Sequence, residues 1–282
     1  MFTIRCDRFR VAGIVSLAVM LSACASGPKA PQPGTPSFHW LAAKDAYKNG
    51  DYVKTDDILS QLTRNSNEYT ERARIWQMVL ANGLASGYME MADTFQEGAK
   101  KNRANPMPFR RQASDYNTKA AAMALQYTEL AHTYLDTSKL KDAELAFDFP
   151  QGSPDPPQQM KKISGGQMLP EAELALVETD MIRRAVRKVV CRSTDAAGDA
   201  EKAKALFQGG AAKAPGAVFV LAIAKGLFDV SDLFGPKKMD QPQRIKIVYQ
   251  EALDALGLLP DSKDAKALSK KIIDSKKKMN LS

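Results

Sequence analysis

The sequence predicts an all-α protein, on the strength of three observations. Apolar residues recur every three or four positions through most of the 282 residues, and no stretch of useful length alternates with the two-residue period of a β-strand. Apolar residues make up 44% and charged residues 26%, as in folded soluble proteins. A chain of this length buries a core unaided, and three cysteines are too few for a disulfide scaffold.

The first 24 residues have the parts of an export signal. Three arginines form a basic head, an apolar run covers residues 11–20, and small residues lead to Cys24. Because the apolar run is too short to span a bilayer comfortably, we expect a cleaved signal peptide over residues 1–23 rather than a transmembrane helix. An ordinary secretory signal with an incidental cysteine is the alternative.

Residues 21–24, Leu-Ser-Ala-Cys, resemble the lipobox of bacterial lipoproteins. The resemblance implies cleavage between Ala23 and Cys24, with acyl chains on the Cys24 thiol and on the new amino group. Several chains on one residue hold a protein at the membrane, whereas a single chain binds only marginally. No Asp follows Cys24, and in a cell with two membranes the resemblance then implies the outer membrane, facing the periplasm, rather than the inner one.

The remaining chain is expected to have a tether and one folded domain. Residues 24–37 carry four prolines and two glycines, which favour an extended tether, and the helical domain is expected over residues 38–282. Without residues 1–23 the chain has 37 basic and 31 acidic residues, a net charge of +6, and residues 263–282 alone contribute +5. So concentrated a charge argues against a nucleic-acid partner, which needs basic residues along a groove.

Capping and turn residues divide the start of the domain into helices. Ser37 is suited to cap a first helix that Gly50 ends, and Asp51 is suited to cap a second helix that runs to about Arg64. A longer helical stretch follows over residues 68–103. Two glycines near its middle weaken a helix by about 1 kcal/mol each, so we expect a break there.

Residues 106–137 are expected to form one long helix with a continuous apolar seam. Its members recur at alternating spacings of four and three residues: Phe109, Ala113, Tyr116, Ala120, Met123, Tyr127, Leu130 and Tyr134. We interpret the seam as a packing face. The alternative is a ligand pocket or pore, for which Tyr116, Tyr127 and Tyr134 are the candidate lining residues.

A proline- and glycine-rich segment interrupts the helical pattern at residues 147–168. We expect a long loop there, with Phe147 and Phe149 holding its entry to the body of the domain. Pro170 suits the first turn of the next helix, whose acidic start and basic end agree with the helix dipole. The remaining helices are expected at about residues 198–213, 216–234 (with a buried apolar part at 217–224), 241–257 and 261–279.

The last of these helices is amphipathic. Asp261 is suited to cap it, and Ala265, Leu268, Ile272 and Met279 fall on one stripe, while lysines occupy most of the other positions. A terminal helix of this kind closes the core of a helical solenoid. The alternative is an electrostatic contact between its lysines and anionic lipid or an acidic protein.

Residues 39–62 resemble a tetratricopeptide repeat (TPR). Ala43 and Tyr47 occupy the small and aromatic positions of the first helix, while Thr55 replaces the Ala that the family prefers. The other matching positions are Gly50, Asp51 and Tyr52 in the turn, Leu59 and Leu62 in the second helix, and a weaker second match at Tyr249, Ala252, Leu253 and Pro260. The resemblance covers about a quarter of the chain and implies TPR-like antiparallel helix pairs, stacked as in an α-solenoid.

The sequence carries no motif for catalysis, for a metal or for a cofactor. The metalloprotease, nucleophile-elbow, Walker and dinucleotide-binding patterns are missing, and His39 and His132 lie far apart. Cys191 is the one thiol left once Cys6 leaves with the signal and Cys24 is acylated, and we expect it to pack near a helix end. We therefore expect no enzymatic activity and no cofactor.

Two functions remain. The first is a lipid-anchored, non-enzymatic scaffold in the cell envelope that docks envelope proteins or peptides. The alternative is a small-molecule-binding accessory lipoprotein of a transporter, similar to the TPR-like component of TRAP systems. An open groove with exposed apolar patches favours the first function, and a deep enclosed pocket favours the second.

Overall fold

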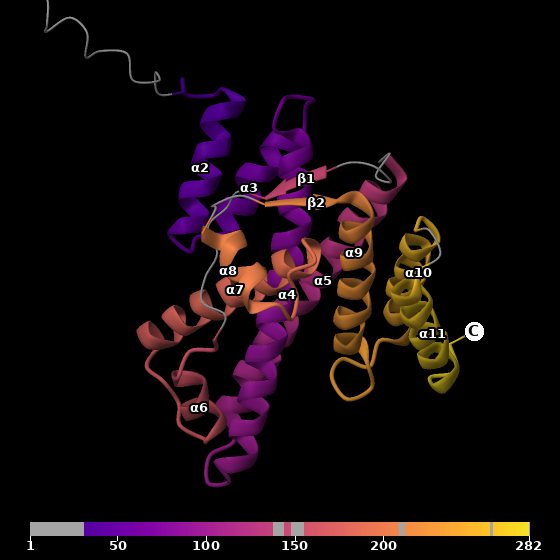
Figure 1. Cartoon of the computed structure of the whole chain (residues 1–282). Coiled ribbons are helices and arrows are strands. Elements are labelled where there is room, and N and C mark those ends of the chain that lie inside the picture. Colours follow the sequence, from indigo (N-terminus) through magenta and orange to yellow (C-terminus); the bar gives the residue numbers. More distant parts are fainter. Residues whose placement is uncertain (1–30, 138–143, 148–154, 209–211, 260–261, 282) are drawn as a thin grey trace, which may run out of the picture.

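The computed structural model describes residues 31–137, 144–147, 155–208, 212–259 and 262–281, whose arrangement is shown in Figure 1. These residues are predominantly helical, with two short strands, so the all-α prediction is confirmed. The predicted signal peptide, Ala23 and Cys24 lie outside the described residues. In chain order the elements are α2 (Pro36–Lys48), α3 (Tyr52–Thr63), α4 (Thr70–Lys101), α5 (Met107–Thr137), β1 (Glu144–Phe147), α6 (Gln159–Ser164), α7 (Glu171–Ser193), α8 (Ala200–Gln208), β2 (Ala212–Pro215), α9 (Gly216–Ser231), the 3-10 helix η2 (Asp232–Phe234), α10 (Pro242–Gly257) and α11 (Lys263–Lys278).

Polar caps and one glycine define the first helix pair. The Thr35 hydroxyl accepts a hydrogen bond from an amide in the first turn of α2 at 3.3 Å, so the cap lies two residues before the predicted Ser37. Gly50 ends this segment with a φ of +80°, which glycine adopts without steric cost. Asp51 accepts a hydrogen bond from the third residue of α3 at 3.1 Å, which confirms its predicted role.

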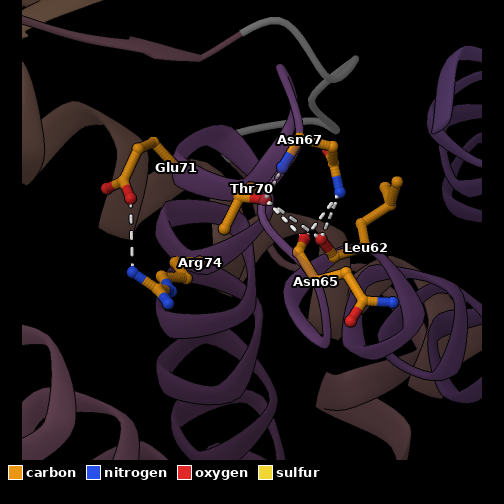
Figure 2. Close-up of polar contacts among 6 residues, drawn as sticks. All are labelled: Leu62, Asn65, Asn67, Thr70, Glu71 and Arg74. Atoms are coloured by element: carbon orange, nitrogen blue, oxygen red, sulfur yellow. Dashed lines mark hydrogen bonds and ion pairs between the residues drawn. The ribbon is translucent and has the colours of Figure 1, made fainter.

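The turn between α3 and α4 is held by two polar side chains, shown in Figure 2. Asn67 donates its side-chain amide to the carbonyl oxygens of Leu62 at 2.8 Å and Asn65 at 2.9 Å. The Thr70 hydroxyl lies within hydrogen-bond distance of the same two carbonyls and accepts the Asn67 backbone N–H at 2.9 Å. These contacts satisfy carbonyls that the end of a helix leaves without partners, and they fix the direction in which α4 starts.

The antiparallel hairpin of α4 and α5 forms the centre of the molecule (Figure 1). The break predicted in α4 is wrong, because the helix is continuous over 32 residues. A Cβ atom on Gly83 would lie 2.4 Å from a Val186 methyl, and one on Gly87 would lie 3.3 Å from the Ile182 Cα. The two glycines therefore serve close packing of α7 on α4, and that packing outweighs their low helix propensity.

The other helices cover the hairpin from two sides. In Figure 1, α6 and α7 lie beside α4 on one side, and α9 to α11 lie on the other. The apolar α9 packs against α4, α5, α7, α10 and α11, which confirms the prediction that residues 217–224 are central. Burial against several neighbours explains why this helix is apolar around most of its circumference.

A short helix occupies part of the segment predicted to be a loop. Within residues 147–168, α6 buries Met160 and Ile163, which lie three positions apart on one face, against α4. The prediction of a continuous loop is therefore wrong, because a single helical turn with two apolar residues leaves too weak a period to detect. Phe149 lies outside the described residues.

Two strands far apart in the sequence form a small antiparallel sheet. Phe147 pairs with Ala212, and Glu144 pairs with Pro215. The helix predicted over residues 198–213 is therefore too long, since α8 ends at Gln208 and β2 follows. Helix propensity is local, whereas this pairing depends on a strand more than sixty residues earlier.

The last helix closes the core as its pattern predicts. Its cap is Ser262, whose hydroxyl accepts the Ala265 amide at 3.1 Å, so the prediction of Asp261 is wrong by one residue. Asp261 itself lies outside the described residues. The apolar stripe is buried or half-buried against the main core: Ala265, Leu268, Ile272 and Met279.

Candidate functional site

The three seam tyrosines lie in the core of the protein. Tyr116, Tyr127 and Tyr134 are each at most 3% exposed. Tyr127 donates its hydroxyl to the Ile223 carbonyl at 3.0 Å, and Tyr116 donates to a Glu178 carboxylate oxygen at 2.9 Å. Burial raises the pKa of all three phenols, so they remain neutral and act as packing groups.

Tyr116 also belongs to a small polar cluster at the surface. The Lys119 ammonium lies 3.1 Å from Glu178 and about 5 Å from the ring centres of Tyr116 and Tyr88. Burial, followed by the Glu178 charge, raises the pKa of Tyr88 to about 12. Because Lys119 and Glu178 neutralise each other, the cluster offers a charged ligand little attraction.

The described residues provide no evidence for a metal centre or an activated thiol. No group of three or more His, Cys, Asp or Glu side chains in this part of the chain is placed to hold a metal ion. Cys191 is half-buried in the last turn of α7, and burial raises the pKa of its thiol despite the nearby Arg187. A protonated, half-buried thiol is a poor nucleophile.

A hollow of about 540 Å³ opens between α4, α5 and the segment that joins η2 to α10. We call it the α4–α5 hollow. Its volume lies in the range typical of ligand sites. Its lining residues are Gln96, Ala99, Lys100, Arg110, Ala113, Ser114, Asn117, Thr118, Lys238 and Met239.

The third wall of the hollow is fixed by a lysine. Lys238 lies between the carboxylates of Asp93 on α4, at 3.0 Å, and Asp232 on η2, at 3.7 Å. Only 13% of the Lys238 side chain is exposed, so these ion pairs are partly shielded from water. They hold the connection after η2 against the hairpin, and this contact gives the hollow its depth.

The lining is rich in hydrogen-bond donors and contains no carboxylate. Lys100 pairs with Glu97, whereas Arg110 is exposed and forms no ion pair with any described residue. The Asn117 side-chain oxygen is buried and accepts no hydrogen bond from these residues.

Sequence reasoning did not find the α4–α5 hollow. The hollow is lined on α5 by residues of its polar face, among them Arg110, Ser114 and Asn117. Polar residues on the exposed face of a helix are the normal case, so their pattern does not indicate a binding site. The available hint was the connection at residues 235–241, which is long for a helix–helix turn and carries two lysines.

A second concavity of about 550 Å³ lies on α10 and α11. We call it the α10–α11 groove. It combines apolar side chains with the lysines of the basic C-terminal helix, and Ile273 in it is 41% exposed. Its lining residues are Leu253, Ile273, Lys276, Lys277, Asn280 and Leu281.

Comparisons with known proteins identify no relative from which the role of these two concavities could be inferred. No family model, no curated protein and no solved structure matches the chain. Among the described helices, none combines the length and the apolar character that a membrane crossing requires.

Proposed function

We propose that the protein is a lipid-anchored, non-enzymatic interaction protein of the cell envelope that docks other envelope proteins or peptides. The observation that carries this proposal is the contrast between a filled interior and concave surfaces. The seam tyrosines fill the space between helices, while the α4–α5 hollow and the α10–α11 groove lie at the surface. Surfaces of this kind suit a partner that binds from outside.

The attachment to the membrane rests on the lipobox resemblance. A diacylglycerol and a further acyl chain on Cys24 would hold the domain at the membrane, with residues 24–37 as a tether. The outer membrane, facing the periplasm, is the proposed location in a cell with two membranes.

The first helix pair supports a TPR-like origin of the scaffold. Ala43, Tyr47, Leu59 and Leu62 are all buried, as the corresponding repeat positions require. The departure at Thr55 is accommodated, since its hydroxyl donates to the Asp51 carbonyl at 2.7 Å within the helix. We propose that this pair is the most repeat-like part of the chain.

Photo-crosslinking in intact cells tests the docking function. A photoreactive residue at Ser114, which lines the α4–α5 hollow, should give a discrete crosslinked protein. The same residue at Ala122, exposed on the same helix but outside the hollow, should not. Cell fractionation tests the anchor, since the Cys24→Ala variant should leave the membrane fraction. A soluble wild type, or no crosslink from Ser114, would contradict the proposal.

The volume of the α4–α5 hollow also fits a second function, that of a small-molecule-binding accessory of a transporter. Native mass spectrometry of the protein purified from its own cells separates the two. A small molecule that stays bound and is lost in the Asn117→Leu variant supports the second function. An unliganded mass together with a protein crosslink supports docking.

A further inference from the structure

We propose that the α4–α5 hollow binds an acidic peptide segment, with one carboxylate on Arg110 and peptide carbonyls on the neutral donors beside it. This inference rests on the proposed docking function and names the chemistry of the partner. The hollow is lined by three cations and several donors from three elements, and by no carboxylate. A ligand rich in acceptors is therefore its chemical complement.

Arg110 is the charge that such a ligand would meet first. The other two cations of the lining are already engaged, Lys100 with Glu97, and Lys238 with Asp93 and Asp232. Arg110 forms no ion pair with any described residue. Its guanidinium can donate two parallel hydrogen bonds to one carboxylate, a geometry that adds strength and specificity.

The remaining donors suit a peptide chain better than a compact anion. One unpaired cation does not balance a phosphate, whereas it does balance a single Asp or Glu side chain. The Ser114 hydroxyl and the Gln96 side-chain amide supply neutral donors for peptide carbonyls. Ala99 and Met239 provide apolar surface for the carbon atoms of the bound segment.

Fluorescence anisotropy with a labelled Gly-Glu-Glu-Glu-Gly peptide tests the inference on the purified full-length protein. The Gly-Gln-Gln-Gln-Gly peptide is the uncharged control. We expect Arg110→Gln to weaken binding of the acidic peptide about tenfold. Arg111→Gln removes an equal charge from the neighbouring exposed residue, which does not line the hollow, and should change the affinity by less than about twofold.

Three further variants test whether the peptide binds in the hollow itself. Ser114→Asp places a carboxylate in the lining and should weaken binding as Arg110→Gln does, while Ala122→Asp on the same helix should not. Changing Lys276, Lys277 and Lys278 to Gln removes the basic end of α11 and should leave the affinity nearly unchanged. Thermal unfolding of each variant verifies that it folds.

The outcomes separate this inference from the proposed function. Equal affinity in the Arg110 and Arg111 variants, or loss of binding in the α11 variant, overturns the inference. So does displacement of the peptide by inorganic phosphate at the same concentration as unlabelled peptide, because the hollow would then be a small-anion site. If crosslinks from Ser114 persist in cells under any of these results, docking stands and only the acidic partner is wrong.

Discussion

The two faces of α5 show how one helix serves packing and surface chemistry at adjacent positions. Tyr116 is buried in the core, while Ser114 and Asn117, one to two positions away along the helix, line the α4–α5 hollow. The apolar face repeats with the period of the helix, so its role is visible in the sequence. The polar face becomes concave only where the segment after η2 lies beside it.

Truncation of Tyr127, on the buried face, should cause the largest loss of stability of any single change to α5. Its ring is fully enclosed, and its hydroxyl donates to the Ile223 carbonyl. We expect Tyr127→Ala to lower the free energy of unfolding by about 3–5 kcal/mol, measured by urea denaturation. Tyr127→Phe keeps the ring and should cost about 1–3 kcal/mol, through the carbonyl left unpaired. A Tyr127→Ala protein with wild-type stability would refute the core assignment.

The second prediction extends the comparison to the close contact of α4 with α7. Gly83→Ala forces a methyl group against Val186, so we expect a loss of about 1–3 kcal/mol in unfolding free energy. Gly257 in α10 has open space around it, and Gly257→Ala should be neutral or stabilising by up to about 1 kcal/mol. Equal changes in unfolding free energy at both sites would mean that helix propensity, and not interhelical contact, sets the effect of the substitution.

The third prediction compares seam residues that differ in burial. Met123 and Leu130 are only half-buried at the edge of the core, unlike the enclosed Tyr127. Leu130→Ala should therefore cost about 1–2 kcal/mol, below the 2–5 kcal/mol typical of a fully buried leucine. A cost as large as that of Tyr127→Ala would show that the edge of the seam is more enclosed than the structure indicates.

The fourth prediction concerns Asp56, a half-buried carboxylate on α3 that contacts α5. Asp56 accepts a hydrogen bond from Gln126 at 2.8 Å, but its other oxygen is buried without a hydrogen bond, and burial raises the pKa of this carboxyl. Protonated Asp56 therefore stabilises the fold below about pH 4, and this stabilisation is lost as the pH rises through the folded-state pKa.

Replacing Asp56 by Asn removes this titration. The Asp56→Asn variant should melt above the wild type at pH 7, and the difference should shrink on acidification, in thermal scans across the pH range. Asp57 is the exposed neighbour, and its charge raises the Asp56 pKa less than burial does, so Asp57→Asn should shift the melting temperature less than Asp56→Asn. A pH-independent difference between Asp56→Asn and the wild type would argue against the buried charge as its cause.

The smallest effect on stability should come from the hollow face. Arg110 is exposed and forms no ion pair with a described residue, so Arg110→Gln should change the unfolding free energy by less than about 0.5 kcal/mol. Calorimetry of the variant beside Arg111→Gln checks this. A clear destabilisation confined to Arg110→Gln would assign that side chain a structural role and weaken its assignment to ligand binding.

Much of the fold was predictable because it rests on short-range chemistry. The turn at Gly50 and Asp51, the long helix α5 with its seam and the apolar stripe of α11 all appear as predicted. In each case the signal lies within a few residues: a cap, a positive φ or a period of 3.6. The helix ends were less certain, and Thr35 and Ser262 displaced the predicted caps by one or two positions.

The candidate site was not predictable in the same way. Lys238 and Asp93 are 145 residues apart, and their ion pair brings the third wall of the hollow onto the hairpin. Contacts between distant residues also explain β2, which pairs with β1, and Gly83. In the sequence Gly83 suggests a break in the helix, but in the structure it allows α7 to pack closely on α4. The sequence by itself determined most of the helices and their buried faces, since these depend on local propensity and period. Only the tertiary structure decided which polar face became concave, because that depends on contacts between residues remote in the chain.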